Sequence, residues 1–167
     1  MKISTKKIAI SAMLIAFDVI FTRVLALNMP LTKIGLGFAA VMVCGMLYGP
    51  GWAAVCAGLG DLVGSLLFPT GAYFPGFTVT AAITGLVFGL LLYKKINFPR
   101  IVIAVLSTQL VCELLLNTLF ISILYTKAFT ALLATRAIQF VVMSVVEIIF
   151  AELALDRAKL LQKVKLA

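Results

Sequence analysis

The sequence predicts an all-α integral membrane protein with six transmembrane helices and both termini in the cytoplasm. Of its 167 residues, 63% are hydrophobic and only 12% are charged, whereas a soluble domain carries about 25% charged residues. The apolar residues form continuous runs, which is typical of membrane helices and not of the alternating strands of a barrel. We therefore expect a single six-helix membrane domain over residues 1–167.

Six apolar runs define the expected spans, and a straight span needs about 20 residues. The second run is shorter than that, so we expect either its flanks to extend it or the helix to cross only part of the bilayer. The sixth run is expected to continue into the cytoplasm as a charged helix. The approximate spans are 7–27, 34–48, 52–68, 77–93, 101–125 and 128–155.

The first run follows the basic segment MKISTKK, a pattern that resembles a signal peptide. However, the run is about 20 residues long, contains Asp18 and Arg23, and lacks a clear cleavage site, so we expect it to be retained. Ala12 and Ala16 form an AxxxA pair on this helix. Such a pair makes a flat face for close helix docking, either within this chain or against a partner.

The distribution of lysine and arginine predicts the orientation, because these residues favour the cytoplasmic side. With the N-terminus inside, ten of the 14 fall on the inner side. The other four are Arg23, Lys33, Lys127 and Arg136. Arg23 and Arg136 lie within apolar stretches, where a charge costs about 2.5–3.5 kcal/mol on insertion scales. We expect such residues to be kept for pairing or for function.

A compact loop, PTGAYFPG, separates the third and fourth runs at residues 69–76. Its prolines and glycines end one helix and turn the chain before the next. Tyr73 and Phe74 lie at the tip, where aromatic rings favour the membrane–water boundary. The loop is therefore either an ordinary turn with an aromatic belt or a lid over a solute site.

Polar residues on the fifth and sixth runs indicate a pocket. Gln109, Glu113 and Asn117 are spaced four apart, which places them on one helix face. A polar stripe on a membrane helix faces protein or a cavity, and Arg136 and Gln139 on the sixth run lie at a matching depth. We expect these five residues to form a pocket that opens outward. The alternative is a structural network with a Glu113–Arg136 ion pair.

Three further carboxylates lie within apolar runs. Asp61 is expected to pair with or cap a neighbouring helix, and Asp18 has the same ambiguity between structure and function as Arg23. Glu147 lies nearer the cytoplasm, so we leave it out of the outer pocket.

The sequence gives little support for catalysis. It contains no histidine, no carboxylate pair at a plausible spacing on one helix, and no GxxxxGK[ST] phosphate loop. Its cysteines lie inside apolar runs, where we expect free core thiols. The net charge is +8. Most of the cations flank apolar runs, so we attribute this charge to membrane orientation and not to nucleic-acid binding. We therefore expect no enzyme, metal site or cofactor, and uphill transport would draw energy from a partner or an ion gradient. The cysteines are Cys44, Cys56 and Cys112.

Taken together, these features resemble a known family. The short six-helix chain, the AxxxA pair, GPGWAAVCAGLGDLVG and the PTGAYFPGFT loop are similar to the substrate-capture (S) component of energy-coupling factor (ECF) vitamin transporters. FTRVLAL, FPTGAYFPGFT, LLLNTLFISILY and Arg136 resemble the folate-specific branch. The resemblance covers nearly the whole chain, and the PTGAYFPGFT loop is its most specific part.

The resemblance implies a high-affinity folate-binding subunit in the plasma membrane of a prokaryote, with no nucleic-acid partner. It implies docking through Ala12 and Ala16 on a membrane coupling subunit that two cytoplasmic ATPases drive. Tyr73, Phe74 and Phe77 would stack on the folate rings, and Glu113 or Asn117 would bind the pterin edge. Cations would neutralise the glutamate tail of folate. They are Arg23 and Arg136, with Lys33 or Lys127 at the rim.

Two alternatives remain at this point. The same architecture would serve another vitamin or precursor, such as a queuosine precursor, riboflavin or pantothenate. A small membrane enzyme or assembly protein is the rival from a different class, and the missing catalytic groups argue against the enzyme.

Overall fold

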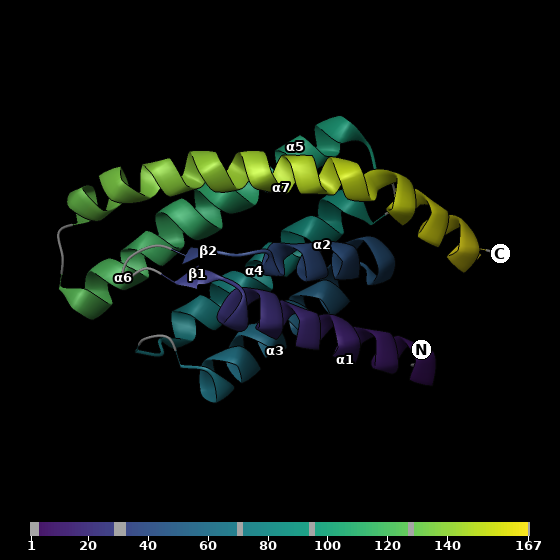
Figure 1. Cartoon of the computed structure of the whole chain (residues 1–167), viewed down its shortest axis with the longest axis horizontal. Helices are drawn as coiled ribbons and strands as arrows, with labels where there is room; N and C mark the ends of the chain where they lie inside the picture. Colours follow the sequence, from purple (N-terminus) through teal and green to yellow (C-terminus); the bar gives the residue numbers. More distant parts are fainter. Residues whose placement is uncertain (1–3, 29–32, 70–71, 94–95, 127–128, 167) are drawn as a thin grey trace.

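The computed structural model describes residues 4–28, 33–69, 72–93, 96–126 and 129–166, and within them it is almost entirely helical (Figure 1). One short antiparallel pair, Leu27 with Ile34 and Asn28 with Lys33, interrupts the helices. The elements in chain order are α1 Thr5–Val19, η1 Ile20–Val24, β1 Leu27–Asn28, β2 Lys33–Ile34, α2 Gly37–Tyr48, α3 Pro50–Leu67, α4 Pro75–Leu92, α5 Phe98–Ser107, η2 Thr108–Leu116, α6 Asn117–Tyr125 and α7 Phe129–Leu166.

These elements make six helical segments, as predicted, because α1 continues into η1 and α5 continues through η2 into α6. Among the described residues, four segments are long and apolar enough to cross a membrane. The chain is therefore an all-helical, multi-pass membrane protein. The four segments are Pro50–Leu67, Pro75–Leu92, Phe98–Tyr125 and Phe129–Leu153.

The second segment is short, as the sequence predicts. α2 has 12 residues, which is about 18 Å of helix against about 30 Å of hydrocarbon. It is enclosed by its neighbours, and most of its residues are buried. Phe38 at its start packs edge-to-face on Phe150 of α7, with ring centroids 5.6 Å apart. A helix shielded in this way does not need to match the bilayer by its own length.

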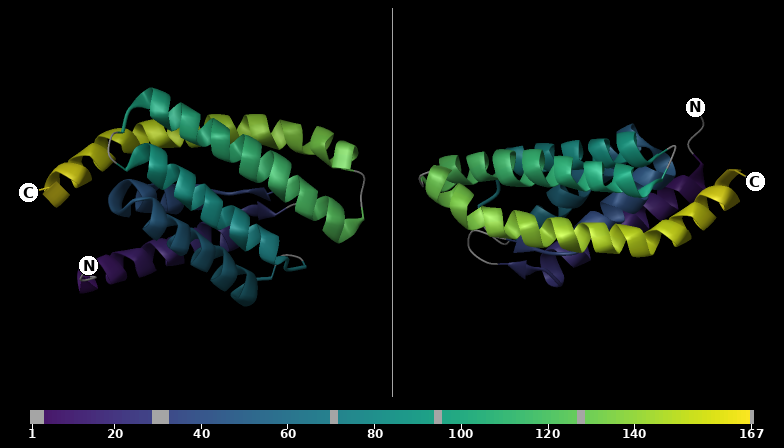
Figure 2. Two further views of the ribbon diagram at one scale, coloured as in Figure 1. Left: turned by 180° about the vertical axis from the view of Figure 1, so that it is seen from behind. Right: turned by 90° about the horizontal axis from the view of Figure 1, so that it is seen from above.

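The sixth segment continues well past the apolar run, to Leu166. The start of α1 and the end of α7 lie at the same end of the bundle in every view (Figure 2). The same placement follows from an even number of crossings. It agrees with the predicted common side for the two termini, and their cytoplasmic location stays a prediction from the charge distribution.

The central helices pack through glycines. A Cβ atom added at Gly85 of α4 would lie 2.8 Å from the carbonyl carbon of Ala53 in α3, and one at Gly45 of α2 would lie 2.9 Å from the amide nitrogen of Gly89. Side chains at these positions would push the backbones apart, which is the reason for small residues at membrane helix contacts. The apolar core beside this contact consists of fully buried side chains such as Phe88, Leu92, Met42, Ile101 and Val105.

We predict that Gly85→Ala lowers the melting temperature of the detergent-solubilised protein, because the added methyl group overpacks the α3–α4 contact. Overpacking costs about 1–3 kcal/mol. Gly51→Ala is the matched control, since a Cβ atom at Gly51 meets nothing within 4 Å. Equal thermal shifts for the two variants would contradict this account of the contact.

Candidate binding site

The structure builds two polar clusters, each centred on an arginine that pairs with a carboxylate from another helix; Arg136 is buried and Arg23 is partly buried. Arg23 Nη2 lies 2.9 Å from Asp61 Oδ1, and Arg136 Nη2 lies 3.6 Å from Glu113 Oε2. Both arginines were predicted to be kept for pairing or function, and Asp61 was expected to pair with a neighbouring helix. Pairing offsets the cost of placing a charge within the apolar bundle.

Two glycines of the GDLVG stretch shape the first cluster. Gly60 of α3 leaves room for the side chain of Asp18, and Gly64 leaves room for Arg23, whose Nε would lie 3.1 Å from an added Cβ atom. Thr22 donates a hydrogen bond to Asp18 Oδ1 at 3.1 Å. Arg23 lies on η1, a π-helical turn that follows α1. Turns of this kind are frequent at functional sites because they change the direction of side chains.

Asp61 connects this cluster to the loop between α3 and α4. Its Oδ2 accepts a hydrogen bond from Thr78 Oγ1 at 2.8 Å, and Tyr73 Oη lies 3.1 Å from the same Thr78 oxygen. Tyr73 itself is 42% exposed. Asp61 therefore contacts Arg23 through one carboxylate oxygen. Its other oxygen is linked through Thr78 to Tyr73, which the sequence analysis expects to stack on the ligand rings.

The second cluster joins the middle of the fifth segment to α7. Asn117 Nδ2 donates to Glu113 Oε2 at 3.0 Å, so this oxygen serves both Asn117 and Arg136. Arg136 is only 4% exposed, and its Nε and Nη1 atoms are buried without a hydrogen-bond partner. Buried donors are nearly always satisfied in proteins. The two guanidinium nitrogens therefore indicate a site for an acceptor that the described residues do not supply.

A narrow pocket lies beside Arg136, between η2 and α7. It brings together four of the five predicted pocket residues; Asn117 is instead joined to it through its bond to Glu113. The pocket has no room for a water molecule, so a vitamin needs the surrounding side chains to move. The lining residues are Gln109, Glu113, Leu114, Arg136, Gln139 and Phe140.

Glu147 lies closer to this pocket than the sequence analysis allowed. Gln109 Nε2 donates to Glu147 Oε1 at 2.6 Å, and Glu147 is only 3% exposed. Counting helical depth along one chain placed Glu147 far from the outer end. The partner comes from another helix, so the contact depends on how η2 and α7 pack, which spacing alone does not determine.

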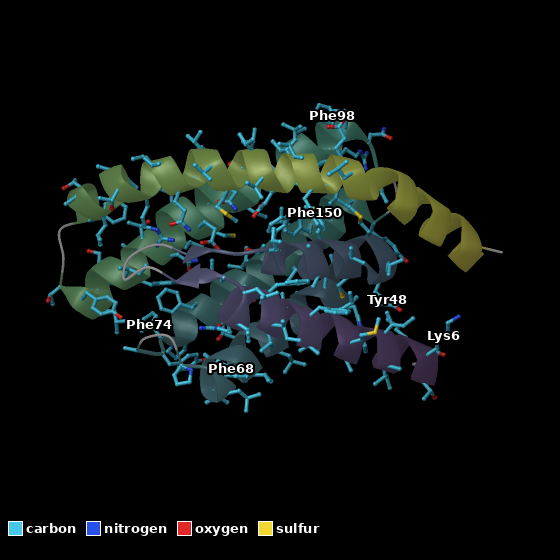
Figure 3. The ribbon with its side chains drawn as sticks, in the orientation of Figure 1. Lys6, Tyr48, Phe68, Phe74, Phe98 and Phe150 are labelled. Carbon is cyan, nitrogen blue, oxygen red and sulfur yellow. The ribbon has the colours of Figure 1, made fainter. Side chains whose placement is uncertain are left out.

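An aromatic cluster joins the start of α4 to α6. Phe74 and Phe77 lie with their ring centroids 6.0 Å apart, and Phe120 of α6 lies 5.2 Å from Phe74 and 6.1 Å from Phe77. Phe77 directly precedes Thr78, and Phe120 lies one turn from Asn117. Phe68 and Phe74 lie at the end of the bundle opposite Lys6 and Tyr48 (Figure 3). Phe120 was not singled out as a site residue, although it lies in the NTLF stretch that was.

Two of the predicted rim cations are not placed. Lys33 forms part of β2, and its side chain lies outside the described residues, as does the whole of Lys127.

The AxxxA pair lies on an exposed face of α1. Ala12 and Ala16 are both exposed, and Met13 and Phe17 beside them are 55% and 43% exposed. Among the described residues nothing buries the pair, so the structure gives no support to the alternative that the pair packs within this chain. The opposite face of α1 packs into the bundle, with Ser11, Asp18 and Val19 buried.

Comparison with known proteins identifies the class. Residues 2–157 match the family described as ECF-type riboflavin transporter, S component, and the chain belongs to this family of transporter S components. It is thus a transport component and not an enzyme, as the sequence predicts.

Particular relatives carry a different vitamin in their names. The chain is 34% identical to "Folate transporter FolT" of Clostridium novyi (strain NT), over 92% of this chain and 91% of the relative. It is 27% identical to "Folate transporter FolT" of Leuconostoc mesenteroides, over 88% and 83%. A solved structure titled "Crystal structure of FolT bound with folic acid" superposes with a TM-score of 0.88 and 32% identity, covering 92% of this chain and 95% of that one.

We predict that Arg136→Leu lowers the melting temperature of the ligand-free protein, because it leaves the partly buried Glu113 without its cation. Adding Glu113→Leu in the same chain restores part of the loss, since the remaining charge is then removed as well. Thermal unfolding of the single and double variants measures this. If the double variant is no more stable than Arg136→Leu alone, the ion pair has no structural role.

Proposed function

We propose that this protein is the folate-binding subunit of an ECF-type vitamin importer. The observation that carries the proposal is Arg136, a buried guanidinium with two nitrogen atoms lacking a protein partner beside a pocket. An anionic ligand group supplies the missing acceptors, because arginine binds carboxylates through paired hydrogen bonds. The folate transporters of Clostridium novyi and Leuconostoc mesenteroides support this ligand through their similarity to the chain.

The side chains of the proposed site offer chemical groups that suit the parts of folate. Folate has a flat pterin, an aromatic middle section and a glutamate tail with two carboxylates. Phe74, Phe77 and Tyr73 provide rings for stacking. In the proposed complex the glutamate tail pairs with Arg136, and a second carboxylate approaches Arg23. Glu113 and Asn117 bond within the same cluster as Arg136, and Gln139 lines the same pocket. These side chains therefore surround the tail end of folate, and the pterin lies among the aromatic rings.

Folate entry requires rearrangement at the aromatic cluster. The pocket beside Arg136 has no room for a water molecule, whereas ligands of this size occupy sites of about 300–1,000 Å³. Phe74 and Phe77 lie at the start of α4, and Phe120 lies on α6, so the rings of the two helices can separate without breaking a helix. We propose that the folate rings insert between them.

Riboflavin is the second candidate, because the matching family model carries that vitamin in its description. The candidates differ in charge: the tail of folate has two carboxylates, whereas riboflavin is neutral. Two arginines near the site, the buried Arg136 and the partly buried Arg23, favour the anionic ligand.

The exposed AxxxA face of α1 is the proposed contact with a membrane coupling subunit. Ala12 and Ala16 allow a partner helix to approach closely. Two cytoplasmic ATPases bound to that subunit would power uptake, in agreement with the lack of a phosphate loop in this chain. In this proposal the protein lies in the plasma membrane of a prokaryote with both termini inside.

We predict that Arg136→Ala weakens folate binding by about tenfold or more, because the glutamate tail loses its charge-assisted hydrogen bonds. Binding of pteroate, which lacks the glutamate, changes much less. Isothermal titration of both ligands measures the difference. An equal loss for the two ligands would remove Arg136 from the tail site.

We predict that Ala12→Trp or Ala16→Trp leaves the affinity for folate unchanged but abolishes folate uptake by cells that contain the partner subunits. A bulky ring prevents close helix approach on a face that this chain does not use for its own packing. Uptake of labelled folate and binding to purified protein are measured together. A parallel loss of binding would mean that the alanines support the fold.

We also predict that folate raises the melting temperature of the purified protein more than riboflavin, pantothenate or a queuosine precursor at equal concentration. A ligand that binds only the folded state stabilises it in proportion to the logarithm of its concentration over Kd. A larger rise in melting temperature with riboflavin would contradict the folate proposal and favour riboflavin as the ligand.

A further inference from the structure

Asp61 lies between two groups that the proposed function uses separately. One of its oxygens pairs with Arg23, and the other accepts a hydrogen bond from Thr78. We propose that Asp61 is a positioning residue that holds the Tyr73 side of the loop over the folate site through Thr78 while it orients Arg23. This inference rests on the proposed function, since it assigns a role within that site.

The hydrogen-bond chain has a direction. A hydroxyl group has one proton to donate, and the proton of Thr78 is directed to Asp61 Oδ2 at 2.8 Å. Tyr73 Oη, 3.1 Å from Thr78 Oγ1, must therefore donate to Thr78. The chain runs from Tyr73 through Thr78 to Asp61, and it ends on a carboxylate that also binds Arg23. Removing the Asp61 carboxylate therefore releases both Arg23 and the hydrogen-bonded Thr78 and Tyr73.

The surroundings fix the Asp61 carboxylate. Gly60 and Gly64 flank it on α3 and bring Asp18 and Arg23 close to the helix backbone. Arg23 approaches from η1, and Thr78 approaches from the first turn of α4. Three elements, η1, α3 and α4, thus meet at the side chain of Asp61. A movement of η1 that carries Arg23 toward a ligand is therefore transmitted to Asp61, and from there through Thr78 to Tyr73.

Three substitutions separate the two branches. Thr78→Val cuts the link to Tyr73 and keeps the ion pair, Tyr73→Phe removes only the phenolic hydroxyl, and Asp61→Asn alters both branches. Thr84→Val is the matched control, because its hydroxyl group bonds to the backbone carbonyl of Thr80 on the same helix.

The first measurement is amide hydrogen exchange of residues 72–74 in the ligand-free protein. We expect Thr78→Val and Tyr73→Phe each to speed exchange about two- to fivefold, the lower range for one hydrogen bond at an exposed side chain. The Thr78/Tyr73 double variant should match Thr78→Val alone, because both changes break one chain. Thr84→Val should leave exchange unchanged.

The second measurement is the binding of folate and pteroate. Thr78→Val and Tyr73→Phe should speed folate dissociation by the same factor and preserve the preference for folate over pteroate. Asp61→Asn should also reduce that preference, because Arg23 is no longer held.

Unchanged loop exchange in Tyr73→Phe and Thr78→Val, additive effects in the double variant, or an equal effect of Thr84→Val would overturn the inference. If the wild-type protein fails to bind folate, the proposed function fails. The exchange comparison needs no ligand. It therefore still decides whether the hydrogen bonds from Tyr73 through Thr78 to Asp61 hold the loop in place.

Discussion

The structure depends on pairing charged side chains inside an apolar helix bundle. A charge in the bilayer is costly, and each of the two arginines within the bundle pairs with a carboxylate from another segment: Arg23 with Asp61, and Arg136 with Glu113. Each pair ties together helices that are distant in the sequence. Because the pairs fix helix positions, the same interactions that hold the bundle together also place donors and acceptors at one end of it.

Glycines and π-helical turns allow these pairs to form. Gly60 and Gly64 let Asp18 and Arg23 approach the backbone of α3, where a larger residue would keep them away. η1 and η2 carry Arg23 and Glu113 respectively. A π-helical turn alters the regular spacing of side chains along a helix. Local backbone geometry thus turns polar side chains toward the protein and away from lipid.

The two arginines differ in how completely the chain satisfies them. Arg136 Nη2 is 3.6 Å from Glu113, and the Nε and Nη1 atoms of Arg136 have no partner, so this residue combines a structural contact with capacity for a ligand. Arg23 instead makes a close pair with Asp61, and a ligand carboxylate has to compete with that pair. This difference makes Arg136 the stronger candidate for the tail of an anionic vitamin. It gives Arg23 a role that depends on Asp61.

The sequence by itself determined the membrane class, the six helical segments, the short second helix and the family. These features follow from continuous apolar runs, from lengths measured against the bilayer and from local motifs. It also placed Gln109, Glu113, Arg136 and Gln139 in one pocket, because helical spacing and depth are readable along a chain.

Only the tertiary structure decided which partners these residues take. The Gln109–Glu147 bond, the position of Phe120 beside Phe74, and the Tyr73–Thr78–Asp61 chain each join different elements. The exposure of Ala12 and Ala16 was likewise undecided until the bundle was assembled. Such contacts depend on the rotation of each helix about its axis and on its tilt. Side-chain packing between helices sets both, and periodicity within a single helix does not specify either.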